Sequence, residues 1–360
     1  MKSTLGGVGL LCLLTTSSWA QSQVTLFGVM DLSLRQVSNS GVASQKSLAS
    51  GGNSTSRFGV RGSEDLGGGW LAAFHLESAI AADTGVAGQA APAGQFWDRR
   101  ATVSLVNKSL GEVRLGRDFV PTYVNWGRFD PFGYVGVASA SNFVSGSPVG
   151  PIRAAFGTGP NTTVRSSNAL QLLLPAGLGG FEGGLMLAPS EGGTAANGQH
   201  KVVSARLGYA TGPLAVSLAT ASSENNLTAG ERFRDNAAAG SYDLGAVKLH
   251  AGWRQFKFTT SKQTNVLLAA IVPLELGQIN LSWNRADLDG TVAATDVSAN
   301  DATQIGLGYV YSLSKRTALY ASYARVNNRG AATFTVPGGA PGSTPGGAST
   351  GYEGGVRHTF

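Results

Sequence analysis

The chain has 360 residues, of which 51 are glycine and only 13% are charged, with a formal net charge of +6 at pH 7. A soluble protein this poor in charge would disperse poorly in water, whereas a barrel with a lipid-facing band needs no charged surface there. The basic excess does not indicate nucleic-acid binding, because the lysines and arginines form neither a block nor a basic helix. No run of 18 apolar residues follows residue 20, which excludes membrane-spanning helices.

Residues 1–20 predict a signal peptide that is removed on export, leaving residues 21–360 as a single barrel domain. Lys2 supplies the charged start, residues 5–14 the apolar core, and residues 18–20 a small-x-small cleavage site. About ten apolar residues are too few to cross a hydrocarbon layer of roughly 30 Å, which argues against a membrane anchor. Cys12, the only cysteine, lies inside this segment, so we expect no disulfide and no thiolate ligand in the mature chain.

After residue 20, strand-like segments of alternating polarity are joined by two kinds of connection. The short ones are turns rich in glycine, proline and polar residues, at 65–69, 107–111, 175–180, 211–213, 243–245, 273–277 and 312–315. The others, nearly all long and polar, lie at 35–54, 81–96, 119–163, 188–200, 222–236, 258–262, 289–301 and 328–349. Seven turns alternating with eight loops predict an all-β fold, a 16-stranded antiparallel transmembrane β-barrel with both termini on the turn side.

The strand period of two gives each strand a lipid face and a lumen face. In 24–35, for example, Leu26 and Leu34 fall on the lipid face, opposite Asp31. An arginine in the lipid would cost about 2–4 kcal/mol at mid-depth, so mid-strand charges are expected inside the barrel. The same alternation places these residues on the lumen face: Asp31, Arg35, Arg57, Arg61, His75, Glu77 and Arg100.

The longest connection, 119–163, is predicted to fold into the pore. It begins shortly after Arg117, part-way up the wall, and it is rich in Gly, Ala, Ser and Phe. Sixteen strands would otherwise enclose a wide aqueous channel, and loops longer than about 15 residues are usually functional. Counted from the turn rim, Arg57, Arg100 and Arg165 lie between mid-barrel and the outer part of the wall.

Several segments resemble the general, non-specific trimeric porins of Gram-negative bacteria, especially their β-proteobacterial branch. Residues 24–31 (VTLFGVMD) are similar to the first strand of that branch, and residues 56–69 (SRFGVRGSEDLGGG) to its second strand and first turn. Further similar segments are 115–117 (LGR), 311–317 (YSLSKRT), 319–323 (LYASY) and 355–360 (GVRHTF). The resemblance spans the whole mature chain, and its first and last blocks are highly specific.

The resemblance implies a homotrimer in the outer membrane, reached through the periplasm and surrounded by outer-membrane lipid and lipopolysaccharide. It also implies that Arg57, Arg100 and Arg165 form an arginine ladder on one wall of a pore narrowed by the third loop. Arg165 rests on its motif position alone, because residues 165–170 alternate poorly. The closing residues are similar to the signal read by the outer-membrane assembly machinery: Tyr352, Val356, His358 and Phe360.

The third loop departs from the family pattern in its charge. From Phe132 to Phe181 the sequence contains no Asp or Glu, and the Pro-Glu-Phe type motif of cation-preferring relatives is absent. Arg153 and Arg165 are present instead, and Arg153 is expected at the pore constriction with the ladder arginines. A basic wall without an acidic counterweight predicts passage of small solutes with a moderate preference for anions. Asp31, Glu77 and Asp118 are expected to offset part of the charge at the constriction, with Arg35 and Arg61 in the vestibules.

Two other functions stay open. A substrate-specific channel for phosphate or small organic anions would need fixed binding groups, but residues 119–163 contain no lysine. An outer-membrane barrel enzyme would need an acid–base constellation, and His75 with Glu77 is better explained as a pore-lining pair. We expect no metal, because no histidine has a second ligand at metal spacing. The glycine clusters lack a dinucleotide or phosphate-loop pattern, so no cofactor is expected either.

Overall fold

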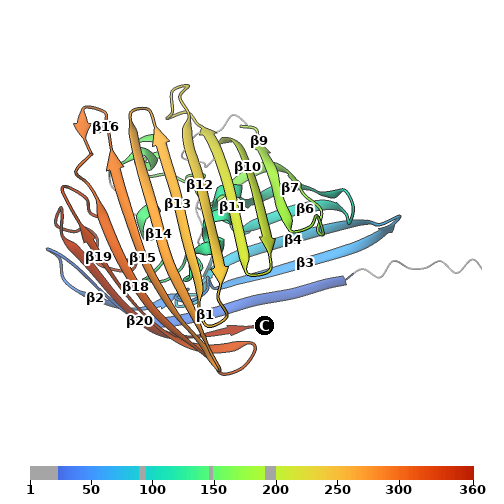
Figure 1. Cartoon of the computed structure of the whole chain (residues 1–360), viewed down its shortest axis with the longest axis horizontal. Helices are drawn as coiled ribbons and strands as arrows, with labels where there is room; N and C mark the ends of the chain where they lie inside the picture. The colour runs from blue at the N-terminus through green and yellow to red at the C-terminus, as the bar shows by residue number, and fades with distance from the viewer. Residues whose placement is uncertain (1–22, 89–94, 146–148, 191–199) are drawn as a thin grey trace, which may run out of the picture.

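The computed structural model describes residues 23–88, 95–145, 149–190 and 200–360, which form a closed barrel of sixteen antiparallel strands (Figure 1). The barrel closes where the first and last strands pair, from Val29 opposite Thr359 to Asn39 opposite Ser349. The strands are β1 Gln23–Asn39, β3 Arg57–Gly67, β4 Trp70–Ala81, β6 Arg100–Asn107, β7 Gly111–Phe119, β8 Arg165–Leu173, β9 Phe181–Ala188, β10 Lys201–Thr211, β11 Leu214–Glu224, β12 Phe233–Asp243, β13 Lys248–Phe258, β14 Ser261–Leu274, β15 Gly277–Asp289, β18 Ala302–Ser312, β19 Thr317–Asn328 and β20 Ala348–Thr359. The predicted fold class is therefore confirmed, whereas the predicted signal peptide lies outside the described residues.

The connections follow the predicted alternation of turns and loops. At the turn between β12 and β13, the Asp243 carboxylate accepts a hydrogen bond from the N–H of Gly245, whose φ of 82° suits glycine. The opposite rim carries the longer loops, which add the short strands β2 Gln45–Ser50, β5 Val86–Ala87, β16 Thr291–Val292 and β17 Thr295–Asp296. No helix among the described residues is long and apolar enough to cross a membrane.

The two faces of the strands separate as expected. In β1, Leu26 and Leu34 are 59% and 73% exposed on the outside, whereas Asp31 and Ser33 are buried on the inside. The outer surface is a band of leucine, valine and aromatic side chains. This alternation matches lipid outside and a polar interior inside, which is the arrangement of an outer-membrane barrel.

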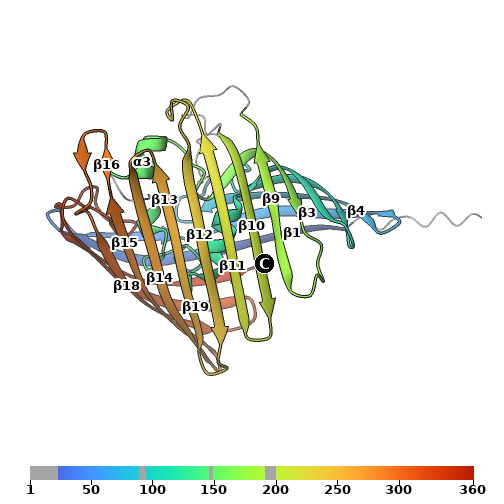
Figure 2. The ribbon, with the colours of Figure 1, turned by 45° about the horizontal axis from the view of Figure 1, so that its top comes forward.

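The third loop, residues 120–164, fills part of the barrel as predicted. It contains α1 Pro121–Phe129, α2 Asn142–Ser145 and α3 Pro151–Phe156, drawn in green within the ring of strands (Figures 1 and 2). Pro121 begins α1, where its missing N–H costs no hydrogen bond. Helix α1 packs mainly against β10 to β13, and α3 against β12 to β14. The loop therefore covers that wall and leaves the side formed by β3 to β8 facing the open lumen.

The first long connection differs from its prediction. Instead of an external loop over 35–54, β1 continues to Asn39 and β2 returns alongside it, from Val37 opposite Gln45 to Leu32 opposite Ser50. Residues 51–56 then turn into the barrel before β3 begins, and we call them the inward segment. The sequence Gly-Gly-Asn-Ser-Thr-Ser favours a turn but gives no direction for it. The direction comes from Asp31, which binds this segment from inside the barrel.

Candidate pore constriction

Six arginines gather on the side of the lumen that the third loop leaves open. This arginine wall consists of Arg57, Arg99, Arg100, Arg114, Arg117 and Arg165. The three predicted ladder residues are brought together through their neighbours: Arg165 donates from Nε to the carbonyl oxygen of Arg99 at 3.0 Å, and Arg57 and Arg99 share Glu77. Arg100 lies beside Asp118, with Nη2 and Oδ2 3.5 Å apart.

Carboxylates offset part of this charge. Glu77 pairs with Arg99 and, at 4.0 Å, with Arg57, and its Oε2 lies 3.4 Å from Nε2 of His75. Asp118 accepts from Arg114 at 2.7 Å. These contacts bring Glu77 and Asp118 to the arginine wall.

Arg165 is the least compensated member of the wall. Within the described part of the chain, no carboxylate forms an ion pair with it, and its guanidinium lies 4.5 Å from the centroid of the Phe119 ring. The poor alternation around it has a structural cause: the β7–β8 register shifts between Gly116 and Asp118, and Asn168 has a φ of 57°. A bulge changes the face of the strand to which the neighbouring side chains point, so the alternation of the sequence alone could not place Arg165 in the lumen.

Asp31 does not face the open pore, contrary to the prediction. Its carboxylate is fully buried and accepts hydrogen bonds from the backbone N–H groups of Gly52, Asn53 and Ser54 at 3.2, 3.0 and 2.6 Å, and from the Tyr320 hydroxyl. Neither the polar sequence of residues 51–56 nor the position of Asp31 on the inward face of β1 predicts these hydrogen bonds. Asp31 therefore binds the inward segment instead of lining the open lumen.

The inward segment in turn holds two arginines. Arg57 donates from Nη1 to the Ser54 hydroxyl at 3.1 Å and to the Thr55 carbonyl oxygen at 3.0 Å. Arg357 donates from Nη1 to Oδ1 of Asn53 at 2.7 Å. These bonds fix the direction of guanidinium groups that would otherwise sample many rotamers.

The third loop is tied to the wall opposite the arginines. Arg254 and Asp235 form a fully buried pair, Nη2 to Oδ2 at 2.7 Å. The same pair binds both ends of the loop, because Asp235 accepts from the Thr122 hydroxyl at 2.7 Å and Arg254 donates to the Thr163 carbonyl oxygen at 2.8 Å. The pair thus sets where the loop leaves and rejoins the barrel.

The middle of the third loop has its own anchors. Glu353 accepts the Val137 N–H at 2.8 Å, and Gln304 donates to the Ala138 carbonyl oxygen at 3.0 Å. Asp130 is buried and accepts the backbone N–H groups of Phe132, Tyr134 and Ala140. Burial raises the pKa of Asp130 to about 6, against the opposing effect of these three hydrogen bonds. The one acidic residue in this part of the loop is thus engaged with backbone.

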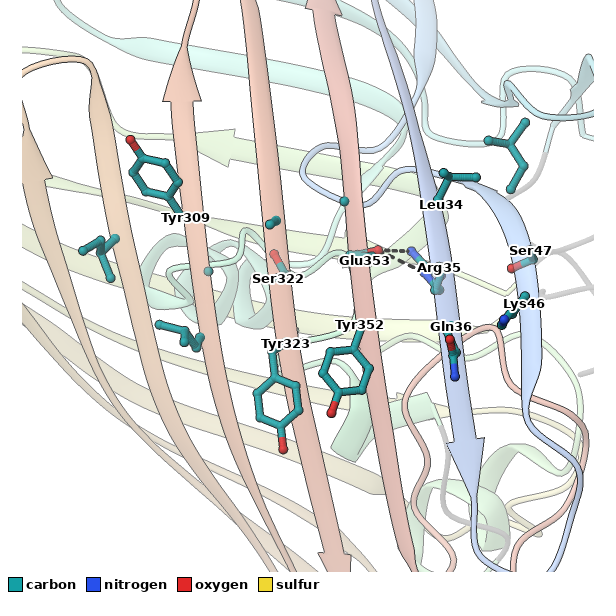
Figure 3. A pocket seen from close by; sticks show the side chains of 16 residues that line it. Leu34, Arg35, Gln36, Lys46, Ser47, Tyr309, Ser322, Tyr323, Tyr352 and Glu353 are labelled. Atoms are coloured by element: carbon teal, nitrogen blue, oxygen red, sulfur yellow. Dashed lines mark hydrogen bonds and ion pairs between the residues drawn. The ribbon is translucent and has the colours of Figure 1, made fainter.

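The remaining predicted residues fall in several places. Arg35 is buried in an ion pair with Glu353 at 2.7 Å rather than lining a vestibule, and this pair is drawn in Figure 3. Arg61 is exposed and lies over the Phe27 ring, and Arg153 is exposed on α3, away from the arginine wall. In the closing strand, Tyr352, Val356 and His358 alternate on the exposed face, and Phe360 exchanges backbone hydrogen bonds with Gly28.

Sequence reasoning missed Arg99, Arg114, Arg117 and Arg357 as lumen residues. Arg357 could have been found, since its neighbours Val356 and His358 face outward and parity therefore turns it inward. Arg99 could not, because it precedes β6, where strand parity does not apply. Among the described residues, no group of three or more His, Cys, Asp or Glu side chains is placed to hold a metal ion.

A closed barrel with an apolar exterior and a charged lumen narrowed by an internal loop defines a pore-forming protein of the outer membrane. The chain belongs to the Gram-negative porin family, whose sequence pattern matches residues 7–331. It is 35% identical to outer membrane porin protein 32 of Delftia acidovorans across all of both chains, and 26% identical to an outer membrane porin protein of Bordetella pertussis across 90% of this chain and 94% of that one. Its fold is similar to that of an anion-selective porin from Comamonas acidovorans, with a TM-score of 0.79 and 33% identity over 94% of this chain and 100% of that one. The protein is thus an outer-membrane porin.

Proposed function

We propose that this porin is a passive diffusion channel for small hydrophilic solutes that prefers anions at its constriction. The main support for this proposal is the arginine wall, which faces a third loop without free carboxylates. Four of its members, Arg57, Arg99, Arg100 and Arg114, share three carboxylates, Glu77, Glu112 and Asp118, so positive charge remains. The similarity to an anion-selective porin supports the same sign.

The physical basis is electrostatic. A row of arginines lining a pore favours anions, and low-dielectric walls concentrate the field in the lumen. Arginine stays protonated at all ordinary pH values, so the preference persists across the physiological range. Glu77 and Asp118 lower the net charge, which makes the preference moderate.

The assembly is part of the same proposal. Exposed apolar side chains cover the described outer surface, as membrane insertion requires, and an outer membrane protein of Vibrio cholerae with a similar fold was solved in a trimer form. We propose a homotrimer in contact with lipid and lipopolysaccharide. Its insertion would depend on the assembly machinery reading Tyr352, Val356, His358 and Phe360.

The test is the zero-current potential of the purified protein in a planar bilayer under a KCl gradient. We expect the sign that reports chloride as more permeable than potassium. Arg57→Gln and Arg165→Gln should move the potential toward zero, whereas Arg57→Lys should retain most of it. Arg285→Gln is the matched control, since Arg285 is an exposed arginine at the end of β15 outside the lumen.

A cation-preferring sign, or variants indistinguishable from Arg285→Gln, would overturn the proposal. The substrate-specific alternative has its own signature. The flux through a channel with a fixed binding site saturates as the concentration of phosphate or a small organic anion rises. The flux through a diffusion pore stays proportional to that concentration.

A further inference from the structure

Phe119 and Arg165 face each other across the neck of the third loop. Phe119 ends β7, Arg165 begins β8, and the two residues are paired in the ladder between these strands. The guanidinium of Arg165 lies 4.5 Å from the centroid of the Phe119 ring, which is close enough for a cation–π contact. The chain leaves the barrel wall after Phe119 and returns at Arg165, so this contact lies where the loop is attached.

Two further rings continue this contact into the third loop. The Tyr123 ring in α1 is stacked on Phe119, with the ring centroids 4.6 Å apart and the planes 20° apart. The Tyr134 ring forms a T-shaped contact with Tyr123 at 5.2 Å, and its hydroxyl accepts a hydrogen bond from Nη1 of Arg254 at 3.4 Å. We call Phe119, Tyr123 and Tyr134 the aromatic bridge, because they connect Arg165 to the buried side chain of Arg254.

Hydrophobic burial alone does not explain the first two rings of the aromatic bridge. Phe119 and Tyr123 are only half-buried, and they lie beside the arginine wall. An aromatic face is favourable in such a place, because its negative potential attracts a cation. Gly127 makes room for this arrangement, since a Cβ atom there would have three atoms of the Tyr123 ring as its nearest neighbours, at 3.5 to 3.8 Å. The Tyr123 ring therefore lies along α1, over Gly127.

Arg165 depends on neutral partners because its charged neighbours repel it. Arg99 and Arg117 both act on it with the same sign of charge, and among the described residues no carboxylate forms an ion pair with it. A long side chain under such repulsion would sample several rotamers, each with the charge at a different place in the lumen. The Arg99 carbonyl oxygen and the Phe119 ring hold the guanidinium without cancelling its charge.

We propose that Phe119 and Tyr123 are positioning residues for anion selectivity, which hold the guanidinium of Arg165 at one place in the lumen with its full charge. Phe119 acts by direct contact, and Tyr123 acts through Phe119. The inference rests on the proposed function, because it explains how one member of the arginine wall is oriented. It also couples selectivity to the third loop, since a displacement of α1 would move Tyr123 away from Phe119.

The test is a double-mutant cycle of Phe119 and Arg165, read from the zero-current potential of the full-length protein in a planar bilayer under a KCl gradient. Phe119→Leu keeps an apolar side chain but removes the aromatic face, so the chloride-to-potassium permeability ratio should fall about twofold. In the Arg165→Gln background, Phe119→Leu should have no further effect, because no charge is left to position. Phe119→Tyr keeps the ring and should keep the wild-type ratio.

The chain offers matched controls for each part of the aromatic bridge. Phe27 lies 5.2 Å from the guanidinium of Arg61, so Phe27→Leu removes the same kind of contact outside the arginine wall and should leave the ratio unchanged. Tyr123→Phe keeps the stack and Tyr123→Leu breaks it, so only the second should lower the ratio. Gly127→Ala adds one carbon at an ordinary contact distance, whereas Gly127→Val should displace the Tyr123 ring and resemble Tyr123→Leu.

An equal effect of Phe119→Leu with and without Arg165 would overturn the proposal, because the ring would then act on the barrel and not on Arg165. A ratio in Phe119→Leu equal to that in Phe27→Leu would overturn it as well. Unfolding in denaturant shows whether each variant is folded, and Tyr123→Leu, which changes no barrel strand, gives an independent measurement. A wild-type channel that prefers potassium would refute the proposed function, whereas the cycle would still show whether Phe119 acts through Arg165.

Discussion

Asp31 and Arg57 do not touch each other, but both bind Ser54. The Ser54 N–H donates to the Asp31 carboxylate at 2.6 Å, and the Ser54 hydroxyl accepts from Arg57 at 3.1 Å. The residue between the two charges belongs to the inward segment, which leaves the barrel wall at residues 51–56. A buried acid thereby orients a pore arginine without neutralising it directly.

This relationship predicts how the anion preference changes when Asp31 is replaced, and the direction of the change distinguishes an electrostatic role of Asp31 from a structural one. If Asp31 merely lowered the pore charge, Asp31→Asn would strengthen anion preference. We expect the opposite, a weaker preference, because an amide group cannot accept all three N–H groups of the inward segment and Arg57 loses its support. Leaving one buried donor unpaired costs about 1–3 kcal/mol, so the unfolding midpoint in denaturant should fall as well.

The measurement is the zero-current potential of Asp31→Asn beside that of Ser54→Ala, which removes the Arg57 hydroxyl contact alone. Ser54→Ala should shift the potential in the same direction with little loss of stability. A stronger anion preference in Asp31→Asn would show that its charge matters more than its hydrogen bonds.

The Arg254–Asp235 pair should be the most costly ion pair to break. Arg254→Met leaves the Asp235 carboxylate buried without its partner, and such a loss typically costs about 3–5 kcal/mol. The end of the third loop at Thr163 would also lose its hydrogen-bond partner, so single-channel recordings should become noisier. Arg285→Gln, in an exposed pair, should change stability by about 0–1 kcal/mol.

Unfolding in guanidinium chloride, followed by intrinsic fluorescence, checks these values. The double variant Arg254→Met with Asp235→Asn should recover part of the loss, because no buried charge remains. Equal losses in the single and double variants would mean that the pair holds the loop by shape and not by charge.

The sequence predicted those parts of the fold in which a local sequence pattern is compatible with only one structure. Alternation in β1 separated Leu26 and Leu34 from Asp31, because a residue facing lipid and a residue facing the lumen differ in polarity. The turn at Asp243 and Gly245 was visible because an aspartate followed by a positive-φ glycine has a specific local geometry.

The sequence could not predict contacts that depend on distant residues. The inward segment points into the barrel because Asp31 and Tyr320, far apart in the chain, meet there. Arg99 joins the wall through Glu77 although it lies outside a strand, and Arg165 follows a bulge that has no sequence signature. The location of the constriction could therefore be predicted from the sequence better than its charge pairing, which depends on tertiary contacts.

The raised pKa of Asp130 predicts a specific pH dependence of stability. Its pKa is about 6 in the folded protein and 3.8 in an ordinary environment, so the folded state binds the proton more tightly. The contribution of this group to stability is therefore full below pH 3.8 and is lost as pH rises through 6, by about 3 kcal/mol in total. Other carboxylates titrate in the same range, so the comparison must be made between variants.

Asp130→Asn removes this titration and isolates it. The stability of the wild type minus that of Asp130→Asn, measured by denaturant unfolding at several pH values, should fall between pH 4 and pH 7. A difference that stays constant across this range would mean that the three backbone N–H groups hold Asp130 ionised throughout.

The close approach of the third loop to β18 predicts what a small added side chain would do to the pore. A Cβ on Gly308 would lie 2.6 Å from the Phe132 ring, and one on Gly306 would lie 3.0 Å from the Ala138 side chain. Gly308→Val should therefore push the middle of the loop away from its wall, toward the arginines, and lower single-channel conductance. Gly354→Val is the matched control, because it adds the same atoms to a neighbouring part of the barrel where space is open. If Gly308→Val instead raises conductance, the loop has been expelled from the lumen, and anion preference should then weaken because the field of the arginine wall acts across a wider aqueous gap.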